Sequence, residues 1–428
     1  EYCARSRDMV WSQDRYATST VARHVSHVPG TFQMPNHRPI RTAMNALAIG
    51  ATGLMPLAAP AMAQVAPVSA QAADSAATDA RFARFVPKGE PTTTRLDYSL
   101  WNEALNYFVF PMGASLRERA PTVLPNLGTR RVYGHTSGYR MEANRVTFSF
   151  LEDDVIDSLT AYRRDLEATG SEIDIASLPR NEQLAFWINL HNVAIIEQIA
   201  QNYPLKNPSE LMIDGYDLPL DEAPFITVDG VSMSPRDIRT KIVYPNWSDP
   251  KVIYGFFRGD IGGPSLRREA FNGKDVGRLL DSAATEFVNS LRGVDKRGST
   301  MRVSKIYEEA RPFYFRAWPQ DIRAHISRFA SEEITGILAD TTDVETALYE
   351  TAIADLANGE KEPEYTNRVT FDENGATQYP DPRIAGNILR TVTERDAKVA
   401  KMLRNRDRVG QVYLITEEDE PAEPEVVE

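Results

Sequence analysis

Two arginines and three glycines lie close together in the segment RGDIGGPSLR at residues 258–267. Glycines permit close approach of the backbone and leave amide donors open, while Arg258 and Arg267 supply positive charge. The segment could therefore hold a carboxylate or a phosphate. The alternative is a tight loop locked by Arg–Asp pairs, which is favoured because the spacing and the following lysine of a phosphate-binding loop are absent.

A second polar group, Asn189, His191 and Asn192, lies in a strongly apolar stretch. The two asparagines are three residues apart, so they share one face of a helix. A buried amide left unpaired costs roughly 1–3 kcal/mol, so both need partners. They either bind a ligand or hold the backbone of a neighbouring loop. A lone histidine in such a place is more often packed than catalytic, but His191 remains a candidate for proton transfer.

Asp260 and Ser265 are the other candidate catalytic residues, acting beside His191. Ser265 lies in neither a Gly-x-Ser-x-Gly nor a Ser-x-x-Lys motif. Spacings typical of zinc ligands, such as His-Glu-x-x-His, do not occur, so we predict neither a metal nor a cofactor. The one cysteine, Cys3, precedes a predicted signal peptide, so thiol chemistry is not expected in the mature chain.

The elements that must position these residues are mostly helices. The most apolar helix is predicted over residues 180–201, with Ser177 as its N-cap and Pro179 in its first turn. Because little of it is polar, we expect it at the centre of the domain. Apolar residues at three- and four-residue steps predict further helices over 96–108, 150–166 and 274–291.

Extended structure is predicted in the second half of the chain. An Asp-Gly pair at the centre of the alternating stretch 225–233 predicts a β-hairpin, and residues 234–237 form a capping box for the next helix. Strands are predicted over 251–257 and 301–307, and helices return over 319–356. The fold class is therefore α+β, a single helix-rich domain with a small antiparallel sheet.

Composition and charge narrow the range of partners. The chain is 42% hydrophobic and 25% charged, as in soluble globular proteins, with a net charge of −12. Residues 1–63 carry six arginines against three acids, so their removal gives a net charge near −15. Such a surface repels phosphate backbones, and no basic run with interleaved aromatic residues is present. We expect a small-molecule or peptide ligand and no nucleic acid.

The N-terminal part has the order of a secretory signal. From Met34, basic residues precede an apolar run of 14 residues, Ala46 to Ala59, and Ala61-Met62-Ala63 follows. A membrane-spanning helix needs about 20 residues, so no permanent membrane anchor is predicted. We expect export to the periplasm or the extracellular space. The alternative is a buried alanine-rich helix.

Several separated segments carry a resemblance to a known family. LAFWINLHNVAII at 184–196, the NYPLKNPSEL that follows, RGDIGGPSLRREAF at 258–271, VDGVSMSPRDI at 228–238 and VSKIY at 303–307 resemble, in order and spacing, the bacterial family called domain of unknown function 547. The resemblance covers about residues 95–315. It implies an often exported protein, with a fold similar to papain-like and transglutaminase-like hydrolases.

The chain differs from that family at two positions where many members carry a cysteine. Many members carry Cys-Gly-Ala and Cys-Pro where this sequence has Arg258-Gly259 and Gly263-Pro264. A thiolate mechanism needs the sulfur and a neighbouring imidazole. Cysteine catalysis is therefore excluded here.

The resulting organisation runs from the targeting segment to an acidic end. The parts are an upstream extension before the true start (1–33), the signal peptide (34–63), a flexible linker (64–94), the family-type domain (95–358), a C-terminal extension with a helix over 382–403 (359–416), and an acidic disordered tail (417–428).

Three functional hypotheses remain. The first is an envelope binding or scaffold module that uses Asn189, Asn192, Arg258 and Arg267 around a ligand groove. The second is a peptide or cell-wall hydrolase or acyl transferase with non-cysteine chemistry. The third is a purely structural interaction module, which predicts no ligand groove at these residues.

Overall fold

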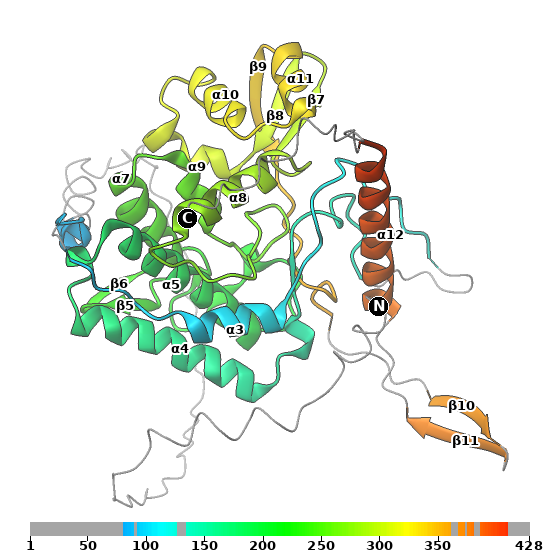
Figure 1. The fold of residues 1–428 in the computed structure, drawn as a ribbon. Coiled ribbons are helices and arrows are strands. Elements are labelled where there is room, and N and C mark those ends of the chain that lie inside the picture. Colours follow the sequence, from blue (N-terminus) through cyan, green and yellow to red (C-terminus); the bar gives the residue numbers. More distant parts are fainter. Residues whose placement is uncertain are drawn as a thin grey trace, which may run out of the picture. The chain divides into compact units, whose positions relative to one another are not determined.

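The structure, a computed structural model, describes residues 80–89, 92–125, 134–360, 367–372, 375–380 and 386–409 (Figure 1). Its helices are α3 (Ser99–Phe108), α4 (Asp153–Glu172), α5 (Arg180–Gln201), α6 (Pro235–Asp237), α7 (Tyr244–Asn246), α8 (Val276–Val288), α9 (Ile306–Tyr314), α10 (Gln320–Ser327), α11 (Glu332–Asp340) and α12 (Gly386–Val409). Within the described part of the chain, none of the helices has the length and apolar character needed to span a membrane. The predicted extension at 1–33, signal at 34–63 and tail at 417–428 lie outside the described residues.

The strands are short and form small separate sheets. They are β1 (Val109–Phe110), β2 (Arg145–Val146), β3 (Met212–Ile213), β4 (Leu218–Pro219), β5 (Ile226–Val228), β6 (Val231–Met233), β7 (Val294–Arg297), β8 (Thr300–Ser304), β9 (Asp343–Leu348), β10 (Asn367–Asp372) and β11 (Gly375–Pro380). In the described residues they form four antiparallel pairs and one three-stranded sheet, β7-β8-β9. The mixed α+β class is confirmed, but the single small antiparallel sheet is wrong, since β8 and β9 run parallel.

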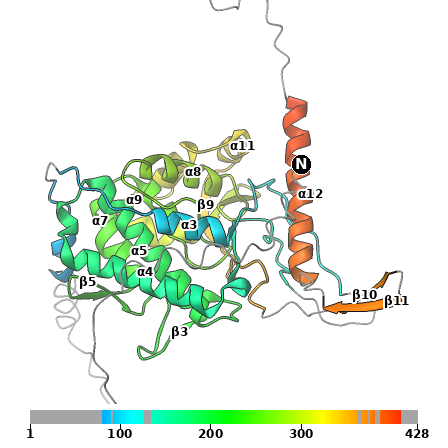
Figure 2. The same ribbon diagram turned by 60° about the horizontal axis from the view of Figure 1, so that its bottom comes forward.

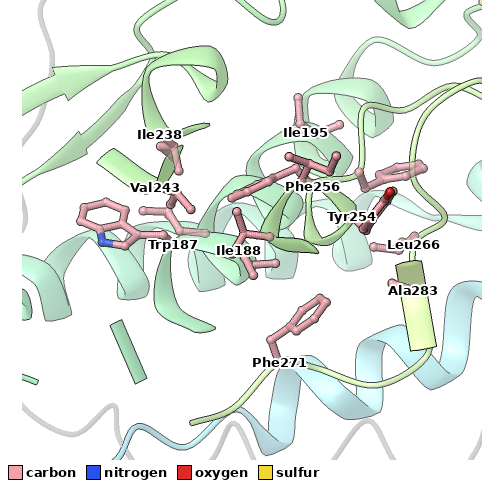
Figure 3. Packing of buried hydrophobic residues seen from close by; sticks show 14 of the residues in the cluster. Trp187, Ile188, Ile195, Ile238, Val243, Tyr254, Phe256, Leu266, Phe271 and Ala283 are labelled. Carbon is pink, nitrogen blue, oxygen red and sulfur yellow. The ribbon is translucent and has the colours of Figure 1, made fainter. Parts of the chain in front are cut away.

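Helix α5 lies at the centre of the domain, with the bounds that its sequence predicts. Nearly every residue from Glu182 to Ala200 is buried. Figure 3 shows Trp187, Ile188 and Ile195 of this helix in one apolar cluster with Phe256 and Phe271. A helix that is apolar on all sides is stable only when other elements cover all of it.

The start of α5 differs from the prediction. Its N-cap is Pro179, and no side chain caps the helix there. Ser177 instead belongs to a short 3₁₀ turn that Asp174 caps. The amide of Gln183 reaches back and donates to the carbonyl groups of Ala176 and Leu178.

Helices α3 and α4 cover one side of the domain, as their apolar periodicity predicts. Helix α4 packs along α5 (Figure 2). Helix α3 buries Trp101, Leu105 and Phe108. The ring of Trp101 stacks on that of Tyr162 in α4, with their centroids 5.7 Å apart.

The predicted hairpin and its capping box are confirmed. Strands β5 and β6 pair around Asp229 and Gly230, whose φ angles are 47° and 72°. Both central residues of a tight two-residue turn need positive φ, and Asp-Gly tolerates it. Ser234 and Asp237 then cap each other's backbone groups at the start of α6.

Residues 251–257 are not the predicted strand. Pro250–Gly255 is a 3₁₀ helix, capped by the side chain of Asp249, and extended chain follows. The residues are buried, but an apolar run of this length has no period that separates strand from buried helix. The predicted burial of these residues is confirmed, but the predicted backbone conformation is wrong.

The predicted helical span 319–356 is helical only in its first part. Helices α10 and α11 confirm that part, but Asp343–Leu348 is strand β9. Its parallel pairing with β8 joins residues about forty positions apart, for example Thr300 with Asp343. Such a tertiary partner overrides local preference and leaves no local signal.

The segment expected as a flexible linker over 64–94 is packed in part of its described portion. Phe82 and Phe85 are buried, and the ring of Phe85 meets that of Trp187 in α5 edge-on, with centroids 5.0 Å apart. Ordered structure therefore begins before the predicted boundary at residue 95.

Helix α12 confirms the helix expected in the C-terminal extension. Among the described residues, it packs on 110–118 and 134–142 through several polar contacts. Arg140 donates to Glu394 from two nitrogens, at 2.8 and 3.0 Å. Lys398 donates to the carbonyl group of Met141 at 2.7 Å.

Candidate functional site

The amide of Asn192 joins α5 to the chain that precedes the candidate loop. Its Nδ2 donates to the carbonyl group of Gly255 at 2.9 Å, and its Oδ1 accepts from the backbone N–H of Phe257 at 3.0 Å. The side chain thereby satisfies two buried backbone groups where the 3₁₀ helix gives way to extended chain.

Asn189 makes the same kind of pair with the chain after the loop. Its Nδ2 donates to the carbonyl group of Phe271 at 2.7 Å, and its Oδ1 accepts from the N–H of the same residue at 3.2 Å. Asn189 and Asn192 are both buried. The two asparagines therefore hold the backbone of a neighbouring loop, which is the alternative to ligand binding. The ligand-binding role predicted for them stays a prediction.

His191 is buried between polar neighbours that use both of its ring nitrogens. Nδ1 lies 3.1 Å from Oδ1 of Asn192, and Nε2 lies 2.9 Å from Nη1 of Arg239. An arginine can only donate, so Nε2 is the acceptor and Nδ1 carries the proton. Burial, and then the charge of Arg239, lowers the pKa of His191 to about 3. The imidazole is therefore neutral, and its one lone pair is occupied.

Arg239 is the centre of a group that we call the charge cluster, made of Asp221, Arg239, Arg258 and Glu309. Its Nη1 and Nη2 donate to the two oxygens of Asp221 at 2.8 and 2.7 Å. Its Nε and Nη2 donate to the two oxygens of Glu309 at 2.8 and 2.9 Å. Arg258 also donates to Glu309, at 2.8 Å. Such bidentate pairs fix both the position and the orientation of each group.

The charge cluster is buried at its centre and reaches solvent at its edge. The side chain of Arg239 is 0% exposed, whereas those of Asp221 and Glu309 are 29% and 16% exposed. The side chain of Arg258 is 17% exposed, and its buried Nε has no hydrogen-bond partner. The edge of the cluster therefore presents both signs of charge.

Four separate segments supply the charge cluster. Asp221 precedes the hairpin, Arg258 begins the candidate loop, and Glu309 lies on α9. Arg239 lies in a π-helical stretch, Ile238–Val243, between α6 and α7. Such stretches are rare and are frequent at functional sites.

The acids of the charge cluster are ionised at neutral pH. Burial of Glu309 opposes ionisation, but the charges of Arg239 and Arg258 outweigh it and lower its pKa to about 2. The pKa of Asp221 is lowered in the same way, against burial, chiefly by Arg239. No group of three or more histidine, cysteine or acidic side chains suited to a metal occurs among the described residues.

Asp260 lies beside the charge cluster, and both of its carboxylate oxygens accept hydrogen bonds. Its Oδ1 accepts from the N–H of Gly263 and its Oδ2 from the hydroxyl of Tyr349, both at 2.8 Å. Burial raises its pKa to about 6, although Tyr349 and Arg258 act in the opposite direction. This carboxyl changes charge closer to neutral pH than an ordinary aspartate does.

Ser265 and Arg267 lie in a different environment from Arg258. The hydroxyl of Ser265 accepts from Nη2 of Arg292 at 3.0 Å and from the N–H of Asn144 at 3.3 Å. Arg267 is partly exposed, its buried Nε has no partner, and the acids that act on it are Glu269 and Glu286. The structure thus divides the predicted loop: Arg258 and Asp260 belong with the charge cluster, and Ser265 and Arg267 do not.

Comparison with protein families gives one match. Over residues 175–288 the chain matches the family described as "Protein of unknown function, DUF547". These residues form a DUF547 domain. The predicted resemblance is thereby confirmed, over a shorter span than the expected 95–315. Neither the curated proteins nor the solved structures include a match to the chain.

The charge cluster is not contained within the DUF547 domain. Asp221, Arg239 and Arg258 lie inside residues 175–288, while Glu309 comes from outside them, as does Tyr349 beside Asp260. The chain after the domain therefore completes its central polar group. A fragment that ended at residue 288 would leave Arg239 with one carboxylate partner.

Sequence reasoning missed Asp221, Arg239 and Glu309. Each is one charged residue among many, and nothing local separates a buried charge from an exposed one. A signal was nevertheless present, because Arg239 directly follows the family-like VDGVSMSPRDI and Glu309 lies two residues after the family-like VSKIY.

Proposed function

We propose that this protein is a binding module of the cell envelope, with the exposed edge of the charge cluster as its ligand site. The observation that carries the proposal is the setting of Arg258. Its Nη2 donates to Glu309, and the side chain is 17% exposed. A carboxylate is the ligand group that such an arginine favours. The envelope location rests on the predicted signal peptide.

The edge of the site also favours a positive group on the ligand. Asp221 and Glu309 are partly exposed on either side of buried Arg239. A ligand with a carboxylate for Arg258 and an ammonium group for these acids matches both signs of charge. Amino acids and short peptides, including cell-wall peptides, have that chemistry. Because the cluster is fixed by its own hydrogen bonds, little ordering is needed on binding.

One observation favours the alternative, a peptide or cell-wall hydrolase or acyl transferase. The pKa of Asp260 is raised to about 6 by burial, which suits a general acid. Against this, both oxygens of Asp260 accept hydrogen bonds and the residue is 2% exposed. His191 offers no free lone pair. The hydroxyl of Ser265 accepts from Arg292 and from the N–H of Asn144, and no base is hydrogen-bonded to it among the described residues. A papain-like arrangement remains an implication of the family resemblance alone.

The test is calorimetric titration of the purified protein with Ala-Ala and with its N-acetylated and C-amidated forms. We expect the zwitterionic dipeptide to bind and each blocked form to bind at least tenfold more weakly, about 1.4 kcal/mol or more. Arg258→Gln should abolish the preference for a free carboxylate. Arg278→Gln is the matched control, since Arg278 is exposed and pairs with Glu269 away from the cluster.

Two results would reject the proposal. One is the absence of binding by all three dipeptides, and the other is unchanged binding by a folded Arg258→Gln variant. If that variant does not fold, Arg258→Lys keeps the charge and loses the planar donor pattern, so it should weaken binding while the protein stays folded. Release of free alanine during the titration would instead support the hydrolase.

A further inference from the structure

A pocket of about 280 Å³ lies between α12 and the segment on which this helix packs. Apolar side chains form much of its wall: Leu116, Ala120, Pro121, Met141 and Ala397. We call it the α12 pocket. It shares no lining residue with the charge cluster, so it is a separate candidate site.

Most of the charged groups around the α12 pocket are paired. Lys401 donates to both oxygens of Glu118, at 2.5 and 2.7 Å. Glu394 is held by two nitrogens of Arg140. These pairs leave no strong demand for a counter-ion from a ligand.

Lys398 is the exception among the lining residues. Its exposed fraction is 7%, and the partners of its Nζ are the carbonyl groups of Met141 and Gly113, at 2.7 and 3.4 Å. No carboxylate lies within ion-pair distance in the described residues. A buried ammonium group without a carboxylate is unusual, because desolvation of its charge is then uncompensated.

The charged groups around Lys398 pair with one another and leave it without a carboxylate in the described part of the chain. The groups with the largest electrostatic effect on it are Glu142, which also lines the pocket, Arg145, Glu286 and Arg292. Glu142 lies 3.6 Å from Arg292, and Glu286 lies 2.6 Å from it. Burial lowers the pKa of Lys398 to about 8, so its charge is not fully stabilised near neutral pH.

We propose that the α12 pocket binds a small monocarboxylate with an apolar body, its carboxylate paired with Lys398 and its apolar part against Met141 and Leu116. The size of the pocket sets the length of the ligand. A cavity of about 150 Å³ holds a benzene-sized molecule, so roughly twice that volume suits about ten non-hydrogen atoms. Eight-carbon octanoate meets both requirements.

Occupancy of the pocket should also hold α12 more firmly on the domain. Ala397, Lys398 and Lys401 of α12 form one wall, and Leu116 and Met141 form the other. The apolar contact of α12 elsewhere is small, with Ile388 buried against Leu356 and Ala357. A ligand that touches both walls therefore adds contacts that exist only while the helix is docked.

The experiment compares octanoate with octan-1-ol, which has the same chain without the charge, by calorimetric titration of the purified protein. We expect octanoate to bind at least tenfold more tightly. Lys398→Met should remove that preference. Lys296→Met is the matched control, because Lys296 pairs with Asp340 and does not line the pocket, and it should change octanoate binding less than threefold.

A second variant keeps the proposal testable if Lys398→Met releases α12. Ala397→Trp leaves Lys398 in place and fills the mouth of the pocket from a position that is exposed. It should abolish octanoate binding. In the unmodified protein, octanoate should slow amide hydrogen exchange of residues 390–401 several-fold. Equal binding of acid and alcohol, equal losses from the two lysine variants, or octanoate binding that survives Ala397→Trp would each overturn the proposal.

Discussion

The charge cluster and the surroundings of the α12 pocket both bury charged groups, and the two regions differ in how completely the charges are paired. In the charge cluster, Arg239 is bound by two carboxylates on both of their oxygens. Around the α12 pocket, Lys398 has carbonyl partners alone, and Oε2 of Glu142 has no hydrogen-bond partner. A pocket lies beside the second region.

The charge cluster is a fully paired polar group that helps to specify the fold. The polar group at the α12 pocket lacks a carboxylate partner for Lys398 among the described residues. Removing one member of a fully paired buried group leaves the others desolvated and uncompensated, which is strongly destabilising. Around the α12 pocket, the missing interaction is one that a ligand could supply. The following predictions test this contrast in order of expected effect.

Arg239→Met should be the most damaging substitution. It leaves Asp221 and Glu309 without their main partner, and breaking a buried pair in this way costs about 3–5 kcal/mol. Chemical denaturation would measure the loss. Arg236→Met is the control, since Arg236 is 48% exposed and pairs with Asp221 and Glu222 at the surface. It should cost less than about 1 kcal/mol. Similar losses for the two variants would contradict the central role of Arg239.

Asn192→Ala should have the next largest effect. It leaves the carbonyl group of Gly255 and the N–H of Phe257 unpaired in the core, at a cost of about 2–4 kcal/mol. Asn202→Ala removes one bond from the exposed end of the same helix, to the carbonyl group of Gln198, and should cost less than about 1 kcal/mol. Thermal unfolding of both variants tests this. A stable, folded Asn192→Ala would show that the asparagine is not needed for the fold, which would strengthen its predicted binding role.

Asp260 predicts a pH dependence with a definite sign. Burial raises its pKa to about 6 in the folded state, above the unfolded value near 3.9. The folded state therefore holds this proton more tightly, and the stability that it adds is complete below about pH 4 and lost as the pH rises through 6. Up to about 3 kcal/mol is involved. Asp260→Asn should thus gain stability relative to the unmodified protein between pH 4 and 7.

The control for this prediction is Asp249, an aspartate whose pKa is shifted in the opposite direction. The pKa of Asp249 is lowered, because hydrogen bonds from Arg328 and from the N–H of Lys251 outweigh its partial burial. Asp249→Asn should therefore be less stable than the unmodified protein throughout that range, by an amount that changes little with pH, because the stability that a lowered pKa adds is lost only below about pH 4. Urea unfolding at four pH values distinguishes the two. Parallel curves for Asp260→Asn and the unmodified protein would contradict the raised pKa.

The parts of the fold that sequence could predict are those with local signals. Helix α5 has the predicted bounds because a long apolar run admits few other structures, and the hairpin at Asp229 and Gly230 follows from their tolerance of positive φ. Strand β9 was missed because its partner β8 lies about forty residues away. The 3₁₀ helix before Phe256 was missed because burial alone does not determine the backbone.

The sequence predicted only part of the candidate site. Arg258 and Asp260 were named from their glycine-rich setting, and they lie at the charge cluster. Arg267 and Ser265 were named with them and lie elsewhere, since adjacency in sequence does not fix where a loop directs its side chains. Asp221, Arg239 and Glu309 meet only after three separate segments have folded together. No spacing in the sequence encodes that meeting.

Glu394→Gln should have the smallest effect, confined to α12. Arg140 loses the charge of its partner but keeps an oxygen to donate to, so docking of the helix should weaken by about 1 kcal/mol. The core should be untouched, because the apolar contact of α12 is the small cluster around Ile388. Hydrogen exchange would show faster opening of α12 with no change in the amides of α5. Asp396→Gln, an exposed acid on the same helix, should change neither. If Glu394→Gln instead lowered the stability of α5, the two regions would be one cooperative unit, and the contrast between them would fail.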